Sequence, residues 1–226
     1  MKYRHELKYY INESDITVLK QQLAPLMEAD PNQGEYGYTI SSLYFDTVYN
    51  RFLDENEAGI SLRDKVRIRC YNYDYSSKKL EIKSKNSNLC IKKSCLITEN
   101  QYHTLLNFPY SHLLDANNNS VLSKVGLLNA SCLLQPSVIV EYDRYAFVHQ
   151  FGNVRITFDR NIRASFQVQS FDQAPLCLPV LEAGKHILEV KYDDILPNYI
   201  AVILDQFNLT QTAFSKYQMC RLTTGI

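Results

Sequence analysis

The chain has 226 residues, is 46% hydrophobic, and carries only seven Gly and seven Pro, so it can bury a sizeable core and is not low-complexity or linker-like. Its 24 basic and 24 acidic residues cancel, which excludes a uniformly basic surface for duplex nucleic acid. The sequence has neither a secretion-signal pattern nor an apolar stretch long enough to span a bilayer. We therefore expect a cytoplasmic protein with a single domain over residues 1–226.

The first half of the chain predicts strands with one early helix. Residues 2–11 alternate in polarity and predict a strand, and a helix follows that Asn12 or Ser14 can cap and Pro25 can kink or end. The predicted apolar face of this helix contains Ile16, Leu19, Leu23 and Leu26. Further strands are predicted at residues 38–47, 65–73, 79–84 and 89–97, with an acidic loop or short helix at 51–59 and a hairpin turn at 86–88.

The second half predicts short helices first and strands afterwards. The helices are predicted at 99–107, 121–128 and 197–207, and the strands at 138–149, 154–159 and 186–192, with a tight turn at 152–153. Consecutive strands joined by tight turns are antiparallel, and about eight of them favour closure. We predict an α+β fold, in which a closed antiparallel β-barrel tunnel of about eight strands has short helices packed outside and at one end.

The polar faces of the predicted strands carry a repeated pattern of cations. In nearly every strand Arg or Lys alternates with aliphatic residues, sometimes beside Glu. A solvated open face would explain any one strand, but it would mix Ser, Thr, Gln, Glu and Lys rather than repeat Arg and Lys. The residues of this pattern are Glu6, Arg67, Arg69, Glu81, Lys83, Lys92, Arg144, Arg155, Glu189 and Lys191.

Closure of the sheet would turn these cations inward and would demand a polyanion. Like charges repel strongly in a cavity of low dielectric constant. Arginine matches phosphate oxygens with two hydrogen bonds, and lysine adds a point charge. The few carboxylates among the cations suit Mg²⁺ or Mn²⁺, which would bridge carboxylate and phosphate oxygens. The pattern therefore predicts a site for a chain of phosphates with a divalent metal.

The same segments resemble the polyphosphate polymerase domain of the vacuolar transporter chaperone (VTC) family, a branch of the CYTH-like triphosphate tunnel metalloenzymes. Each motif alone is weak, whereas the ordered set covers nearly the whole chain. The matching segments are RHELKY (4–9), SLYFDT (42–47), VRIR (66–69), LEIK (80–83), EYDR (141–144), VRITFD (154–159), LEVK (188–191) and FSKY (214–217).

The resemblance implies a tunnel in which the γ-phosphoryl group of a nucleotide passes to phosphate or to a growing polyphosphate chain. It places family cations at Lys8, Arg67, Arg69, Lys83, Lys92, Arg144, Arg155 and Lys216, a hydroxyl pair at Tyr142 and Ser215, and a metal-binding carboxylate at Glu189. We assign the catalytic clamp to Arg67, Arg69, Lys83, Arg144 and Arg155. Phosphate binding is assigned to Lys8, Lys92, Tyr142, Lys191, Ser215 and Lys216. The metal, Mn²⁺ or Mg²⁺, is assigned to Glu189 with Glu6 or Glu81.

The sequence departs from the family pattern at two positions. Arg4 stands where the wider superfamily has its first glutamate, which removes an acidic ligand and favours a polymerase over a two-metal hydrolase. Ser94 stands where many members have a further basic residue. A tunnel triphosphatase that uses water, and a catalytically silent polyphosphate-binding module, are the two alternatives. Expected partners are ATP or another nucleoside triphosphate, phosphate, pyrophosphate and polyphosphate, with no nucleic acid; a membrane protein that threads the product is a further candidate.

Other polar residues are interpreted as structural. The six cysteines and five histidines have no metal-ligand spacing, which argues against zinc. Asp46 and Asp159 are interpreted as turn residues at strand ends. Asp143 and Glu141 alternate with Tyr142 and Arg144, so they are expected on the opposite face of their strand.

Overall fold

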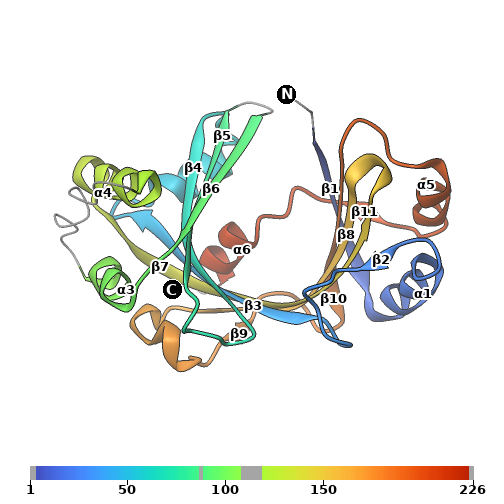
Figure 1. Cartoon of the computed structure of the whole chain (residues 1–226), viewed down its shortest axis with the longest axis horizontal. Helices are drawn as coiled ribbons and strands as arrows, with labels where there is room; N and C mark the ends of the chain where they lie inside the picture. The colour runs from blue at the N-terminus through green and yellow to red at the C-terminus, as the bar shows by residue number, and fades with distance from the viewer. Residues whose placement is uncertain (1–3, 87–88, 108–118, 224–226) are drawn as a thin grey trace. The chain divides into compact units, whose positions relative to one another are not determined.

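The computed structural model describes residues 4–86, 89–107 and 119–223, and these fall into two compact units (Figure 1). Unit 1 comprises Met1–Thr39, Tyr142–Arg163 and Pro179–Ser215, and unit 2 comprises Ile40–Glu141, Ala164–Leu178 and Lys216–Ile226. Each unit is treated by itself below. The single domain expected over residues 1–226 stays a prediction. None of the helices in the described part of the chain combines the length and apolar character that crossing a membrane requires.

Strands dominate the fold, and helices interrupt them at intervals (Figure 1). The elements in chain order are β1 (His5–Asn12), α1 (Glu13–Leu23), β2 (Glu28–Ala29), β3 (Tyr38–Thr47), α2 (Arg51–Glu57), β4 (Arg63–Tyr71), β5 (Lys79–Asn86), β6 (Leu89–Leu96), α3 (Glu99–Leu106), α4 (Ser120–Cys132), β7 (Leu134–His149), η2 (Phe151–Asn153), β8 (Val154–Ser165), η3 (Val168–Gln173), β9 (Leu178–Pro179), β10 (Lys185–Tyr192), α5 (Asn198–Asp205), β11 (Thr210–Gln211) and α6 (Lys216–Thr223). The α+β class is confirmed.

The hydrogen-bonded sheet is mostly antiparallel, and it is not closed over the part of the chain that the structure describes. Among the described residues its strand order is β11-β1-β10-β8-β7-β3-β4-β5-β6, with β2 on β7 and β9 on β8. The order therefore ends at β11 on one side and at β6 on the other, and the described residues of these two strands are not paired with each other. The predicted closure into a barrel is thus not confirmed by hydrogen bonding.

Unit 1 packs α1 and α5 over the apolar face of β1, β10 and β8. Leu7, Val190 and Ile156 occupy successive positions across these three strands, because Leu7 pairs with Val190 and Val190 with Ile156. Helix α1 begins where the Asn12 side chain accepts a hydrogen bond from the Asp15 backbone N–H at 2.8 Å. The helix ends before Pro25, so Leu26 lies outside it and is 39% exposed, which corrects its predicted place on the apolar face.

Unit 2 packs α3 and α4 over the apolar face of β4, β5 and β6. Ile68 pairs with Leu80 across β4 and β5, and both are fully buried together with Tyr102 of α3. Thr98 and Gln101 begin α3 with reciprocal side-chain and backbone hydrogen bonds. Because side chains alternate along a strand, this packing leaves most charged residues of β4 to β6 on the opposite face, whereas Asp64 and Lys93 share the face of Val66 and Ile82.

The predicted elements are confirmed, apart from their ends and a few short pieces. Strand β8 extends to Ser165, well beyond the predicted end at residue 159, and β7 begins at Leu134. Composition and periodicity did not reveal the two-residue strands β2, β9 and β11, because such short strands carry no alternating pattern. Residues 87–88 of the predicted hairpin turn lie outside the described residues.

Candidate functional site

The polar face of unit 2 gathers cations around one carboxylate. In the register of β4, β5 and β6, Arg67 lies opposite Glu81, Glu81 opposite Ser94, and Lys83 opposite both Lys65 and Lys92. Residues that lie opposite each other in an antiparallel pair share a face of the sheet. Over the described residues of these strands, the face carries eight cations, Arg63, Lys65, Arg67, Arg69, Lys79, Lys83, Lys85 and Lys92, with the single carboxylate Glu81.

Glu81 forms ion pairs with three of the cations on this face. It is 1% exposed, and its Oε2 lies 2.8 Å from Arg67 Nε and 2.7 Å from Arg67 Nη2. Lys92 Nζ lies 2.5 Å from its Oε1, and Arg69 Nη1 lies 4.0 Å from its Oε2. Burial alone would raise the pKa of Glu81, but the positive charges of Arg67, Arg69 and Lys92 together lower that pKa to about 2. Glu81 is therefore ionised at neutral pH and serves as an internal counter-ion.

Strand β3 adds hydroxyl groups to the same face. Arg67 Nη1 donates to Tyr44 Oη at 2.8 Å, and Arg69 Nε donates to Ser42 Oγ at 3.2 Å. Burial would raise the pKa of Tyr44, yet the neighbouring Arg67 and Arg69 lower it. The predicted clamp residues Arg67 and Arg69 are thus held in place by bonds on both sides of β4.

Helix α6 packs against this face within unit 2. The Tyr217 ring lies 5.2 Å from the Tyr44 ring, and the Tyr217 hydroxyl donates to the Asp46 carboxylate. Asp46 also accepts hydrogen bonds from the backbone N–H groups of Phe52 and Leu53 at the start of α2. The structural role predicted for Asp46 is therefore supported, and its carboxylate fastens α6 and α2 to β3.

The polar face of unit 1 is built around a second buried carboxylate, Glu189. Its carboxylate oxygens lie 3.3 Å from Lys191 Nζ, 3.6 Å from Arg144 Nη2 and 4.0 Å from Lys8 Nζ. Glu6 lies 3.2 Å from the same Lys8 ammonium and 3.7 Å from that of Lys191. The two predicted metal-binding glutamates of β1 and β10 are therefore bridged by two shared lysines.

Arg144 forms an ion pair with Asp159, which was expected to be a turn residue. Asp159 is fully buried inside β8, and it binds Arg144 through both carboxylate oxygens, so the turn interpretation is wrong. Burial would lower the pKa of Arg144, but the Asp159 charge raises it well above its usual value. The Tyr142 ring lies 5.2 Å from the guanidinium group, which brings two predicted site residues together.

Arg155 is fixed by Asp30 and Tyr38. Its Nη2 lies 2.5 Å from Asp30 Oδ2 and donates to Tyr38 Oη at 3.1 Å. Burial would raise the pKa of Asp30, but hydrogen bonds from Asn32 and the charge of Arg155 lower it. Gly37 precedes Tyr38 with φ +96°, and a Cβ there would lie 2.1 Å from the Arg144 carbonyl oxygen, so this close approach requires glycine.

Three predicted phosphate-binding residues remain, namely Lys8, Ser215 and Lys216. Lys8 Nζ donates to the Phe214 carbonyl oxygen at 2.9 Å. Ser215 follows in unit 1 and is partly buried, and Lys216 is the first residue of α6 in unit 2. Asp143 contacts Arg163 and Thr39, and Glu141 accepts hydrogen bonds from Ser41 and Tyr73, which agrees with their predicted structural roles.

The residues present fit a divalent metal that is shared with a substrate. Within the described part of the chain, no group of three or more His, Cys, Asp and Glu could hold a metal ion by itself. Glu6 and Glu189 supply two carboxylates, and Mg²⁺ is commonly bound by one or two carboxylates together with substrate phosphates and water. Thr157 pairs with Glu189 in the sheet, and its buried Oγ1 has no hydrogen-bond partner among the described residues. Such an orphaned hydroxyl is expected where a ligand or its water completes the site.

Sequence reasoning missed four residues that hold the predicted cations in place, namely Asp30, Tyr38, Tyr44 and Asp159. Asp159 has a signal in the sequence, since it continues the alternation of Arg155 and Thr157 along β8. Tyr44 likewise shares the parity of Ser42 on β3. Asp30 had no such signal, because it lies in a turn whose partner Arg155 is distant in sequence.

Comparisons with known proteins place this geometry in a family. The model of the VTC domain matches residues 3–224. Similar solved structures include a candidate adenylyl cyclase from Hippeastrum with a dominant triphosphatase activity, at 13% identity, a TM-score of 0.58, and coverage of 98% of this chain and 96% of that one. A candidate adenylate cyclase from Bacillus halodurans has 14% identity, a TM-score of 0.52, and coverage of 95% and 94%. A protein from Pyrococcus horikoshii has 15% identity, a TM-score of 0.51, and coverage of 96% and 97%. No curated protein matches the sequence. At these identities the structural similarity shows a shared fold.

Proposed function

Since this chain belongs to the VTC domain family, we propose that it transfers phosphoryl groups from a nucleoside triphosphate to phosphate or to a growing polyphosphate chain. The observation that carries the proposal is the charge surplus on the polar face of unit 2. Eight Arg and Lys side chains share that face with the single carboxylate Glu81 among the described residues of β4 to β6. A linked chain of phosphates is the ligand whose charge and oxygen geometry match such an array.

The roles of the cations follow from how they are held. Arg67 and Arg69 are fixed by Glu81, Tyr44 and Ser42, so their guanidinium groups would meet phosphate oxygens with little loss of side-chain freedom. Lys83 and Lys92 add charge on the neighbouring strands. On unit 1, Arg144, Arg155, Lys8 and Lys191 form a second cationic group for the same substrate class. Phosphate contacts are also proposed for Lys216, Ser215 and Tyr142.

The reaction needs positioning and charge neutralisation more than covalent chemistry. An oxygen of the acceptor phosphate attacks the γ-phosphorus in line, while the bond from that phosphorus to the β,γ-bridging oxygen breaks. The leaving nucleoside diphosphate takes the electron pair of the broken bond. A phosphate acceptor is already ionised at neutral pH, so no side chain must remove a proton. The arginines stabilise the charge that spreads over the transferred group.

The metal would be held by Glu189 and Glu6 on unit 1. A bound Mg²⁺ or Mn²⁺ would neutralise phosphate oxygens and orient the triphosphate. Lys8 and Lys191, which contact both carboxylates, would then turn towards phosphate. Glu81 is the weaker metal candidate, because Arg67, Arg69 and Lys92 already surround it. The cytoplasmic location and the membrane-protein partner remain predictions.

A tunnel triphosphatase is the second candidate. The structural neighbour from Hippeastrum has a triphosphatase activity, and the same cations would bind triphosphate if water replaced the phosphate acceptor. Arg4 favours transfer to phosphate, because it stands at a position where the superfamily has a carboxylate. A phosphate-binding module without turnover would use the same cations and no metal.

One incubation distinguishes the three functions. Purified protein is incubated with ATP and Mn²⁺ or Mg²⁺, with and without pyrophosphate as primer, and the products are resolved by gel electrophoresis and ³¹P NMR. We expect long-chain phosphate and a matching amount of ADP. Orthophosphate without any chain would instead establish the triphosphatase. Tight binding of triphosphate without turnover would establish the binding module.

A further inference from the structure

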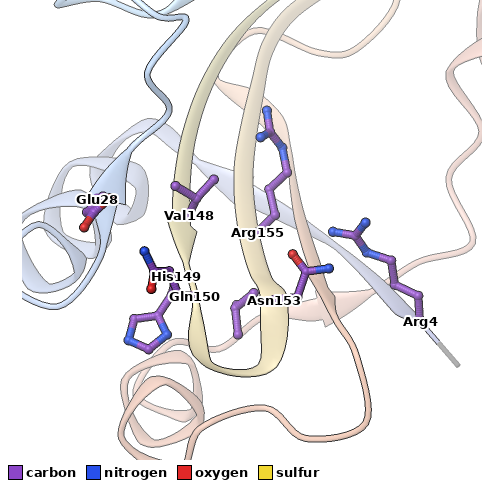
Figure 2. A pocket seen from close by; sticks show the side chains of 8 residues that line it. Arg4, Glu28, Val148, His149, Gln150, Asn153 and Arg155 are labelled. Carbon is purple, nitrogen blue, oxygen red and sulfur yellow. The ribbon is translucent and has the colours of Figure 1, made fainter. Parts of the chain in front are cut away.

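An open pocket of about 340 Å³ lies on unit 1 beside the turn between β7 and β8. Figure 2 shows Val148 between Glu28 and Arg155, with Arg4 beyond Asn153. Its lining includes Arg4, Glu28, Val148, Gln150, Asn153 and Arg155. Its size lies within the range of roughly 300–1,000 Å³ that small-molecule sites occupy.

The pocket adjoins the cationic face of unit 1. Arg155 lines the pocket and is also the cross-strand partner of Lys191, which in turn pairs with Glu6. Arg155 is anchored by Asp30 and Tyr38, so its guanidinium group is held at the boundary between the face and the pocket. A ligand whose phosphates lie along Lys8, Lys191 and Arg155 would therefore place its next chemical group in the pocket.

The lining of the pocket is chemically more mixed than the cationic face beside it. Glu28 is exposed and brings a negative charge, and it lies opposite the apolar Val148 in the β2–β7 pair. Gln150 and Asn153 bring amide groups that both donate and accept hydrogen bonds. A carboxylate can accept from ribose hydroxyls, amides can match the edge of a base, and the Arg4 guanidinium can stack on a base. Beyond Arg155 the lining therefore combines one carboxylate, two amides and the Arg4 guanidinium, a set that can serve the ribose and base of a nucleoside.

We propose that this pocket binds the nucleoside of the nucleoside triphosphate donor, with Glu28 accepting from the ribose and Gln150 contacting the base. The inference rests on the proposed function, because it assumes that the triphosphate lies on the adjoining cations. It assigns the donor an orientation, in which the nucleoside lies at the β7–β8 turn and the phosphates extend from Arg155 towards Glu189. It also makes the pocket the determinant of nucleotide preference.

The test compares ligands with and without a nucleoside. Titration calorimetry in Mg²⁺ buffer measures the Kd of the β,γ-imido analogue of ATP and of inorganic tripolyphosphate for the parent and for two variants. Gln150→Ala is expected to weaken binding of the ATP analogue by about 5- to 10-fold, the usual cost of one hydrogen bond, and to leave tripolyphosphate unchanged. Glu28→Ala is expected to weaken the ATP analogue and to leave tripolyphosphate unchanged or tighter, because a negative charge is removed.

The controls and a third ligand sharpen the result. Gln21→Ala on α1 and Glu35→Ala, both exposed and outside the pocket, should change neither Kd. In the parent the 2′,3′-dideoxy form of the ATP analogue should bind more weakly, and Glu28→Ala should remove that difference. Equal effects of Gln150→Ala on both ligands, or no effect on either, would overturn the nucleoside pocket while leaving the proposed function standing. If the parent binds neither ligand, the proposed function fails and the pocket assignment falls with it.

Discussion

Asp159 holds Arg144 by two parallel hydrogen bonds, 2.6 Å from Nε to Oδ1 and 2.7 Å from Nη2 to Oδ2. The pair crosses from β8 to β7, and Arg144 Nη2 also lies 3.6 Å from Glu189 Oε2. The two-point contact fixes the plane of the guanidinium group, which a single bond would leave free to rotate. Asp159 is therefore a positioning residue for Arg144.

Asp159→Asn should weaken triphosphate binding and destabilise the protein. The amide cannot balance the Arg144 charge, and removing one partner of a buried ion pair costs about 3–5 kcal/mol of unfolding free energy. Calorimetric titration with tripolyphosphate and urea unfolding measure the two effects. Asp143→Asn, which affects a contact with Arg163 on the other side of β7, is the matched control and should leave the tripolyphosphate affinity near that of the parent. Equal losses in the two variants would contradict the positioning role.

Arg67→Ala should lose triphosphate binding and also some stability, because it leaves Glu81 buried with less compensation. Combining Arg67→Ala with Glu81→Gln removes the uncompensated charge. We therefore expect the unfolding free energy of the double variant to return towards that of the parent, while its affinity for tripolyphosphate stays low. Urea unfolding and tripolyphosphate titration separate the two quantities. If the double variant regained the parent's affinity, Arg67 would be a structural residue only.

The Glu81 carboxylate should make stability depend on acid pH. Its pKa in the folded protein is about 2, below the ordinary value of 4.5, so its ionised form stabilises the fold at every pH above about 4.5. That contribution, of the order of 3 kcal/mol, is lost as the pH falls from about 4.5 towards 2. Urea unfolding between pH 7 and pH 3 should show a steeper decline for the parent than for Glu81→Gln. Parallel curves would contradict the assigned pKa.

Glu189→Gln should keep phosphate binding and lose metal-dependent turnover. The amide removes a negative charge from among Lys8, Lys191 and Arg144, so the affinity for tripolyphosphate should hold or increase. ADP release from ATP at increasing Mn²⁺ measures turnover, and Glu182→Gln, an exposed neighbour in sequence, is the control. Turnover equal to that of the parent would remove Glu189 from the metal assignment.

Thr157→Val tests whether the Thr157 hydroxyl binds a ligand or supports the fold. The buried Oγ1 has no hydrogen-bond partner among the described residues, so replacing it with a methyl group should leave the unfolding free energy equal or slightly higher. If the hydroxyl completes the site beside Glu189, the affinity for tripolyphosphate with Mg²⁺ should fall about 5- to 10-fold. Unchanged affinity would mean that the hydroxyl faces no ligand.

Alternation along the strands made most of the cationic residues predictable. Val66 and Ile68 face the core, so Arg67 and Arg69 must share the other face, and the same parity places Glu189 with Lys191. What alternation does not encode is which strands become neighbours. The contacts of Arg144 with Asp159 and of Arg155 with Asp30 depend on pairings between distant segments, which a single sequence does not specify. The predicted closure rests on the number of strands, their tight turns and the family resemblance, and none of these determines whether the end strands form hydrogen bonds.

The Glu81 carboxylate should also favour ligands with several negative charges over monovalent anions on its face of the sheet. Arg67 and Lys92 already hold a carboxylate, so a monovalent anion such as chloride exchanges one partner for another and gains little. A molecule with several linked charges can occupy neighbouring cations together, and each further contact forms at a high effective concentration once the first is made. Under the proposed function, the internal carboxylate would therefore disfavour small monovalent anions relative to a polyvalent ligand.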